Sequence, residues 1–109
     1  MASPNVLEFT ADNWSSLVSS GTLVVADFWA PWCGPCRALA PVIDRVADQF
    51  AGQVKVGKVN VDENGDLAVK YDVSTIPRVL MFKGGDQPIW TRVGTMSDAE
   101  LAKEIQARV

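Results

Sequence analysis

The chain has 109 residues, two cysteines and no histidine, and its 10 basic and 13 acidic residues give a net charge of −3. This length and a hydrophobic content of 48% are typical of one globular domain with one core, here expected over residues 1–109. The absence of histidine excludes His-based catalytic triads, and two cysteines cannot complete a four-ligand zinc site, so we expect no metal centre.

The first half of the chain alternates short apolar runs with helical patterns. In order, the predicted elements are a strand at 5–9, a helix capped by Thr10 and stopped by Gly21, a nearly continuous apolar strand at 22–29, an amphipathic helix after Cys36 that ends at Gly52 with a kink at Pro41, and a strand at 53–61. Strand, helix and strand in about 40 residues predict a βαβ unit with parallel strands and a right-handed crossover.

The second half predicts a hairpin between two helices. In order, we expect a turn at Asn64-Gly65, a short helix around Leu67 and Tyr71, a strand at 78–82, a turn at 83–86, a strand at 88–93, and a last helix opened by the capping box of Ser97 and Glu100. The hairpin is antiparallel, so the sheet is mixed. The predicted order is βαβαβαββα, with one sheet between helices.

The two cysteines lie at the junction of the apolar strand and the amphipathic helix, as Cys33-Gly34-Pro35-Cys36. Thiol–disulfide exchange requires a thiolate, and an ordinary cysteine with a pKa of about 8.5 is mostly protonated at neutral pH. A helix N-terminus stabilises the thiolate of the first cysteine, and Pro35 fits the first turn because it lacks an N–H. We therefore predict an exposed nucleophile at Cys33 and a shielded resolving thiol at Cys36.

Three other interpretations of this pair stay open on the sequence. The cysteines could be two free buried thiols, which would make their spacing beside a βαβ unit a coincidence. They could form half of a zinc site completed by another chain. They could also form a static structural disulfide, although so short a loop restricts the unfolded chain little.

The stretch DFWAPWCGPC resembles the active-site segment of the thioredoxin family. The resemblance extends over almost the whole chain, through KVNVDEN, the TIP tripeptide, FKGG and the VG before the last helix. It implies an α/β thioredoxin fold, a central mixed five-stranded sheet flanked by four helices. It also implies general protein-disulfide reduction by a redox-active Cys33–Cys36 pair without a bound cofactor. Electrons would come from NADPH or ferredoxin through a separate thioredoxin reductase.

Asp27 is the one charged residue in the apolar run 22–29. A buried, unpaired carboxyl group responds by raising its pKa. The resemblance makes Asp27 the proton acceptor and donor for Cys36, acting through water; the alternative is a strand-end aspartate held by local hydrogen bonds. Lys58 shares the inward phase of its strand, and the resemblance makes it the charge partner of Asp27. Its alternative is a lysine that extends to solvent at the end of the strand.

The resemblance also implies a flat apolar surface for the substrate chain. Its residues are the active-site loop residues Trp32, Gly34 and Pro35, together with Ile76, Pro77, Val93 and Gly94. Taken singly, each could be ordinary surface or core. The Ile76–Pro77 bond is implied to be cis, whereas base rates alone favour trans.

Two features depart from the family pattern. Arg78 follows the proline where the family commonly has threonine, and its guanidinium could lie near the thiols or extend to solvent. The hairpin GGDQPIWTRVG is one residue longer than usual and contains Pro88, which fits an edge strand or bulge. Because the hairpin is longer, the family positions that correspond to Val93 and Gly94 are less well defined.

The expected partners are a thioredoxin reductase and disulfide-containing proteins. Scattered basic residues argue against nucleic acid, and the chain has no apolar stretch of membrane-spanning length and no signal-peptide pattern. We expect a cytoplasmic monomer. Gly-Pro between the cysteines resembles the reducing members of the superfamily, whereas oxidases and isomerases commonly have histidine there. The rival functions are an oxidant or isomerase, and a binding subunit that uses the same surface without turnover.

Overall fold

A five-stranded mixed sheet runs through the computed structural model, which describes residues 2–109; Met1, part of the expected domain, lies outside them. The elements follow the predicted order. They are β1 (Val6–Glu8), α1 (Ala11–Val18), β2 (Val24–Trp29), α2 (Gly34–Gln49), β3 (Lys55–Asn60), α3 (Gly65–Lys70), β4 (Arg78–Phe82), β5 (Trp90–Val93) and α4 (Asp98–Gln106). None of these helices is long and apolar enough to cross a membrane.

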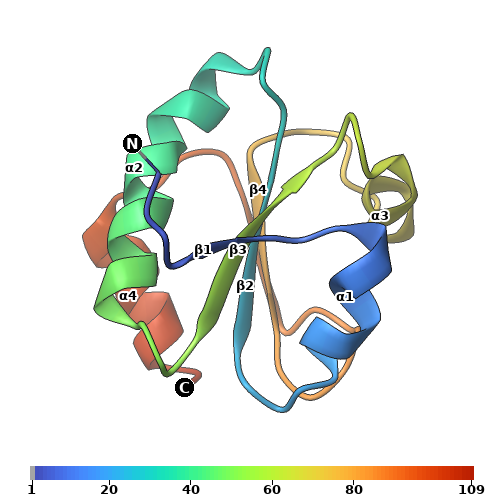
Figure 1. The fold of residues 1–109 in the computed structure, drawn as a ribbon. Coiled ribbons are helices and arrows are strands. Elements are labelled where there is room, and N and C mark those ends of the chain that lie inside the picture. The colour runs from blue at the N-terminus through green and yellow to red at the C-terminus, as the bar shows by residue number, and fades with distance from the viewer. Residues whose placement is uncertain (1) are drawn as a thin grey trace.

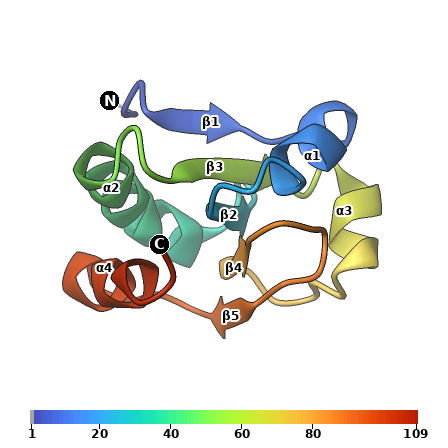
Figure 2. The same cartoon turned by 90° about the horizontal axis from the view of Figure 1, so that it is seen from below.

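The strands are ordered β1-β3-β2-β4-β5, which places the apolar strand β2 at the centre (Figure 1). β3 pairs in parallel with both β1 and β2, and β4 pairs antiparallel with β2 and β5. The helices α2 and α4 cover one face of this sheet, and α1 and α3 cover the other (Figure 2). The mixed sheet and its four helices confirm the predicted fold class.

The two predicted helix starts with capping residues are confirmed. The side chain of Thr10 accepts a hydrogen bond from the Asn13 amide, and that of Ser97 accepts one from the Glu100 amide. In both helices the side chain of the third helical residue accepts a hydrogen bond from the backbone amide of the cap residue, which completes a capping box. These reciprocal bonds satisfy helix N–H groups that have no partner inside the helix.

Most predicted strand and helix boundaries differ from the observed ones by one to three residues, and three of the differences have a local explanation. The helix α2 ends at Gln49 rather than at Gly52, because the chain turns at Phe50, whose carbonyl accepts bonds from the amides of residues 53 and 54. Asn64 and Gly65 do not form a separate turn, since the Asn64 carbonyl accepts the first hydrogen bonds of α3. β5 begins at Trp90 rather than at residue 88, where Pro88 has no N–H to donate.

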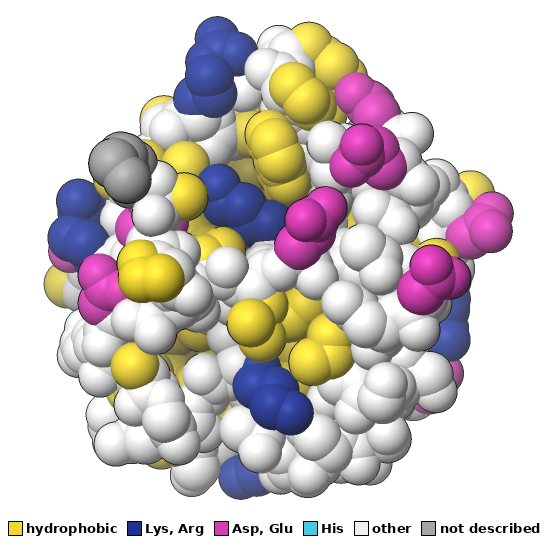
Figure 3. Space-filling view, in the orientation of Figure 1, with side chains coloured by type: hydrophobic (Ala, Val, Ile, Leu, Met, Phe, Trp, Pro, Cys, Tyr) yellow, Lys and Arg dark blue, Asp and Glu magenta, His cyan; other side chains and the backbone are white. Residues whose placement is uncertain are grey.

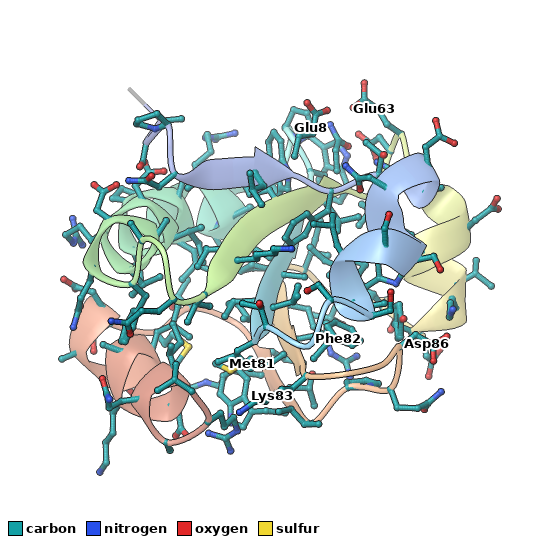
Figure 4. All side chains as sticks on the ribbon, turned by 60° about the horizontal axis from the view of Figure 1, so that its bottom comes forward. Glu8, Glu63, Met81, Phe82, Lys83 and Asp86 are labelled. Carbon is teal, nitrogen blue, oxygen red and sulfur yellow. A yellow bond between two sulfur atoms is a disulfide. The ribbon has the colours of Figure 1, made fainter. Side chains whose placement is uncertain are left out.

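Two apolar clusters fill the space between sheet and helices, one on each face. Adjacent residues of β4 contribute to different clusters: Met81 packs on the α2 and α4 side, and Phe82 packs on the α1 and α3 side (Figure 4). The same alternation along β2 places Val25 in the first cluster and Val24 in the second. Asp27, two residues after Val25, therefore faces α2.

Gly57 of β3 is required by close packing rather than by its backbone angles. A Cβ atom there would lie 2.6 Å from Cζ of Phe9 and 2.7 Å from the backbone oxygen of Leu7. We expect Gly57→Ala to lower the free energy of unfolding by about 2–3 kcal/mol, because a backbone atom cannot move aside cheaply. Urea unfolding measures the loss. Gly85→Ala, with open space around its Cβ, should change stability by less than about 0.5 kcal/mol; equal losses in both variants would contradict the packing argument.

Candidate active site

Cys33 and Cys36 form a disulfide at the N-terminus of α2, with their Cα atoms 5.3 Å apart. Cys33 is the N-cap residue, in an extended backbone conformation, and its Sγ accepts a hydrogen bond from the Cys36 amide at 3.2 Å. Pro35 lies in the first turn, as predicted. The sulfur that the sequence predicts to be the nucleophile thus lies at the positive end of a 16-residue helix.

The predicted difference in exposure between the two cysteines is small. Cys33 is 5% exposed and Cys36 is 2% exposed, so the expectation of an openly exposed Cys33 is wrong for the disulfide form. The reason is packing: both cysteines form a small cluster with Ala30, and Ile76 packs against it. The Cys33 Sγ lies 3.9 Å from the carbonyl oxygen of Ile76. The disulfide also excludes the interpretation of two free thiols.

Asp27 is completely buried on the face of the sheet that α2 covers. Neither of its carboxyl oxygens has a hydrogen-bond partner among the described residues, so the alternative of a strand-end aspartate held by local bonds is wrong. Burial disfavours the charged form and raises the pKa of Asp27 from 3.8 to about 7, and the positive charge of Lys58 opposes this rise. The side chain therefore changes its protonation near neutral pH.

Lys58 is the register partner of Asp27 in the parallel pair of β2 and β3. Its side chain is partly buried, and its Nζ lies 5.2 Å from the centre of the Trp29 ring. The structure thus places Lys58 beside Asp27, and the positive charge of Lys58 acts to lower the pKa of the Asp27 carboxyl group. No ion pair or hydrogen bond joins the two side chains within residues 2–109.

The Ile76–Pro77 peptide bond is cis, as the resemblance implies. It precedes β4, and the Pro77 carbonyl accepts a hydrogen bond from the Gly94 amide at 2.9 Å. Gly94 has a φ of +92°, a conformation that favours glycine. The Ile76–Pro77 segment and the end of β5 are therefore joined, and Ile76 lies beside Cys33.

The predicted apolar surface contains two well-exposed large side chains. Trp32 is 68% exposed and Val93 is 51% exposed, whereas Ile76 and Gly94 are partly buried and Pro77 is buried. Gly34 has open space around it. Sequence reasoning missed Asp62, whose carboxyl oxygens accept hydrogen bonds from the Trp32 indole at 3.1 and 3.2 Å. No local signal could have paired two residues 30 positions apart.

The guanidinium of Arg78 makes two hydrogen bonds with neighbouring segments of the chain. Its Nε donates to Oγ1 of Thr91 at 2.9 Å, and Nη1 donates to the Asp72 carbonyl at 3.3 Å. Arg78 shares the face of Leu80, which belongs to the cluster on the α1 and α3 side, whereas Asp27 faces α2. The guanidinium therefore connects β4 to β5 and to the loop after α3.

The site can perform dithiol–disulfide chemistry with its own side chains. Within residues 2–109 no group of three or more Cys, Asp or Glu side chains is arranged to hold a metal ion. A redox-active sulfur pair lies at a helix N-terminus, and a carboxyl group with a pKa near 7 faces the same helix. Apolar side chains surround the pair.

Comparisons with known proteins agree with this site. The family model described as Thioredoxin matches residues 5–107. The thioredoxin of Haemophilus influenzae is 43% identical over 99 residues, which cover 91% of this chain and 92% of that protein. Thioredoxin 1 of Synechococcus elongatus is 47% identical over 89 residues, 82% of each chain. The chloroplastic M-type thioredoxin of Pisum sativum is 44% identical over 95 residues, which cover 86% of this chain but 55% of that protein.

Proposed function

The chain belongs to the thioredoxin family, whose members are protein-disulfide oxidoreductases, and from this premise we propose specific roles for the residues of its site. Cys33 is the attacking thiol and Cys36 the resolving thiol. The position of Cys33 at the N-cap of α2 carries this assignment, because helix N–H groups stabilise a thiolate there and not at Cys36.

Reduction of a substrate then takes two exchange steps. The Cys33 thiolate attacks one sulfur of the substrate disulfide, and the other substrate sulfur leaves as a thiolate that takes a proton. Cys36 then loses its proton and attacks Sγ of Cys33, so that the second substrate sulfur leaves as a thiolate. The substrate gains two electrons, and Cys33 and Cys36 are oxidised to the disulfide that the structure contains.

Asp27 is the acceptor for the proton of Cys36 in this proposal. Three observations support it: Asp27 is buried, it faces the helix that contains Cys36, and its pKa is raised to about 7. A carboxyl group is the available base, since the chain has no histidine. Lys58 is its charge partner, as their register and the effect of Lys58 on the Asp27 pKa suggest.

The substrate chain docks on the apolar surface around the disulfide. Trp32 and Val93 are exposed, a hydrogen bond joins Gly94 to Pro77, and Ile76 lies beside Cys33. Gly34 and Pro35 complete the loop. An apolar surface accepts extended chains of many different sequences, which suits a general reductase.

We also propose that residues 1–109 act as one domain and as a monomer in the cytoplasm, in electron transport and redox homeostasis. We place the chain in the cytoplasm because a disulfide reductant must be kept as the dithiol between turnovers, which requires a reducing compartment. Disulfide-containing proteins and a reductase are the partners that the family implies. We propose a thioredoxin reductase that draws electrons from NADPH or ferredoxin.

Insulin reduction tests the proposed activity and its electron source. With dithiothreitol as the electron donor, the chain should accelerate the precipitation of reduced insulin chains. The assay is then repeated with an NADPH-dependent reductase and with a ferredoxin-dependent one, and activity with either identifies the donor. No acceleration with dithiothreitol, or full biological function of a double Cys33→Ser, Cys36→Ser variant, would favour the binding-subunit alternative.

A further inference from the structure

Three charged residues form a row across three neighbouring strands. Glu8 of β1 is the register partner of Lys58 in β3, and Lys58 is the register partner of Asp27 in β2. Register partners on adjacent strands project to the same face of a sheet. The row therefore extends from exposed Glu8 through partly buried Lys58 to fully buried Asp27, on the face covered by α2.

A cavity of about 280 Å³ opens along this row. Glu8, Lys58 and Glu63 are its charged lining residues, and Trp29 forms part of its wall. On this face, over β1 and β3, a basic side chain lies beside an acidic one among hydrophobic side chains (Figure 3). Figure 4 shows Glu8 and Glu63, from β1 and from the segment after β3, on the same side of the molecule.

Lys58 has several negative neighbours and no fixed partner. Within residues 2–109 no ion pair joins it to a carboxylate, and its ammonium lies over the Trp29 ring. Lys58 also lines a second hollow, with Arg37 and Asp44 of α2. Among the described residues, no ion pair therefore fixes the ammonium at either end of the row.

We propose that Glu8 is a positioning residue for the resolving step: it draws the Lys58 ammonium toward the solvent end of the row and so weakens the stabilisation of the Asp27 carboxylate by Lys58. The inference rests on the proposed role of Asp27 as the proton acceptor for Cys36. Glu63 lines the first cavity with Lys58, and Arg37 and Asp44 line the second hollow with it. Among Glu8 and these three charged residues, Glu8 alone is a register partner of Lys58.

Removing the charge of Glu8 should lower the pKa of Asp27. Strands lie about 4.8 Å apart, so Glu8 is roughly 10 Å from Asp27 and half that distance from Lys58. Direct repulsion across 10 Å is weak, whereas a lysine that turns toward Asp27 acts at short range. The expected fall in Glu8→Gln is about half a pKa unit, most of it transmitted through Lys58.

The test is a ¹³C NMR titration of the Asp27 carboxyl in the oxidised protein, in which neither cysteine titrates. Glu8→Gln should shift the Asp27 midpoint down by about 0.5 unit when Lys58 is present and by less than about 0.2 unit in a Lys58→Met background. Asp12→Asn, which removes an exposed charge on α1, is the matched control and should leave the midpoint in place.

Three results would overturn the inference: no shift in Glu8→Gln, an equal shift in Asp12→Asn, or an equal shift in the Lys58→Met background. In the reduced protein, the pH profile of the resolving step should move by the same amount as the NMR midpoint. A separate experiment tests the proposed role of Asp27: if Asp27→Asn leaves the rate of the resolving step unchanged, Asp27 is not the proton acceptor. That result would not alter the NMR midpoints. Glu8 is exposed, so the glutamine variant should fold normally.

Discussion

Replacement of Cys33 by serine is expected to lower the rate of insulin reduction by roughly a thousandfold or more. A serine hydroxyl is not ionised at neutral pH, so the N-cap position of α2 has no thiolate to stabilise. The remaining sulfur, that of Cys36, lies inside the helix and is only 2% exposed, so it attacks the substrate poorly. Turbidity of reduced insulin with dithiothreitol as donor measures the loss.

Cys36→Ser provides the matched comparison, because it retains the attacking sulfur and removes the resolving one. This variant should react once with a disulfide substrate and then stall, while Cys33→Ser should not react at all. Urea unfolding of both variants against the reduced wild-type chain checks that each is folded. A Cys33→Ser variant that retains more than a tenth of the activity would contradict the assignment.

Asp27→Asn is expected to stabilise the folded chain at pH 8 by about 4 kcal/mol and to have little effect near pH 3. The physical reason is the raised pKa of Asp27, which moves from 3.8 to about 7 because its carboxyl is buried without hydrogen-bond partners. The folded state holds the proton more tightly than the unfolded state. The free energy of unfolding of the wild-type chain therefore falls as the pH rises from about 4 to about 7. The asparagine variant has no carboxyl group at this position, so its stability does not show this fall.

The measurement is urea unfolding of the oxidised wild-type and variant chains at several pH values. The two stability curves should meet at low pH and separate with a slope of up to about 1.4 kcal/mol per pH unit. The same substitution should slow the attack of Cys36 on a mixed disulfide and spare the attack of Cys33 on substrate. Parallel stability curves from pH 3 to pH 8 would contradict the raised pKa.

The parts of the site that depend on local sequence could be predicted. Cys33 and Cys36 lie where a buried strand meets an amphipathic helix, and that junction determines the N-cap geometry. The burial of Asp27 follows from the apolar run around it and from the alternation of side chains along a strand. The cis bond before Pro77 required the family resemblance, because local sequence favours trans.

The parts that depend on contacts between distant segments could not be predicted. Cys33 is covered because Ile76, 43 residues away, packs against it. The bond from Trp32 to Asp62 spans 30 positions. The row through Lys58 needs the register of three strands, which no single segment determines. Arg78 could be noticed as a departure, but its partner Thr91 depends on the β4–β5 pairing.

Trapping of the mixed disulfide tests most directly the claim that Cys33 attacks and Cys36 resolves. Reduced Cys36→Ser and reduced Cys33→Ser are each mixed with a small disulfide-containing protein at pH 7, and mass spectrometry after digestion locates the covalent bond. We expect the adduct to accumulate in Cys36→Ser, with the substrate bonded to Cys33, and to be absent from Cys33→Ser on the same time scale. Faster trapping through Cys36 in the Cys33→Ser variant would contradict the account.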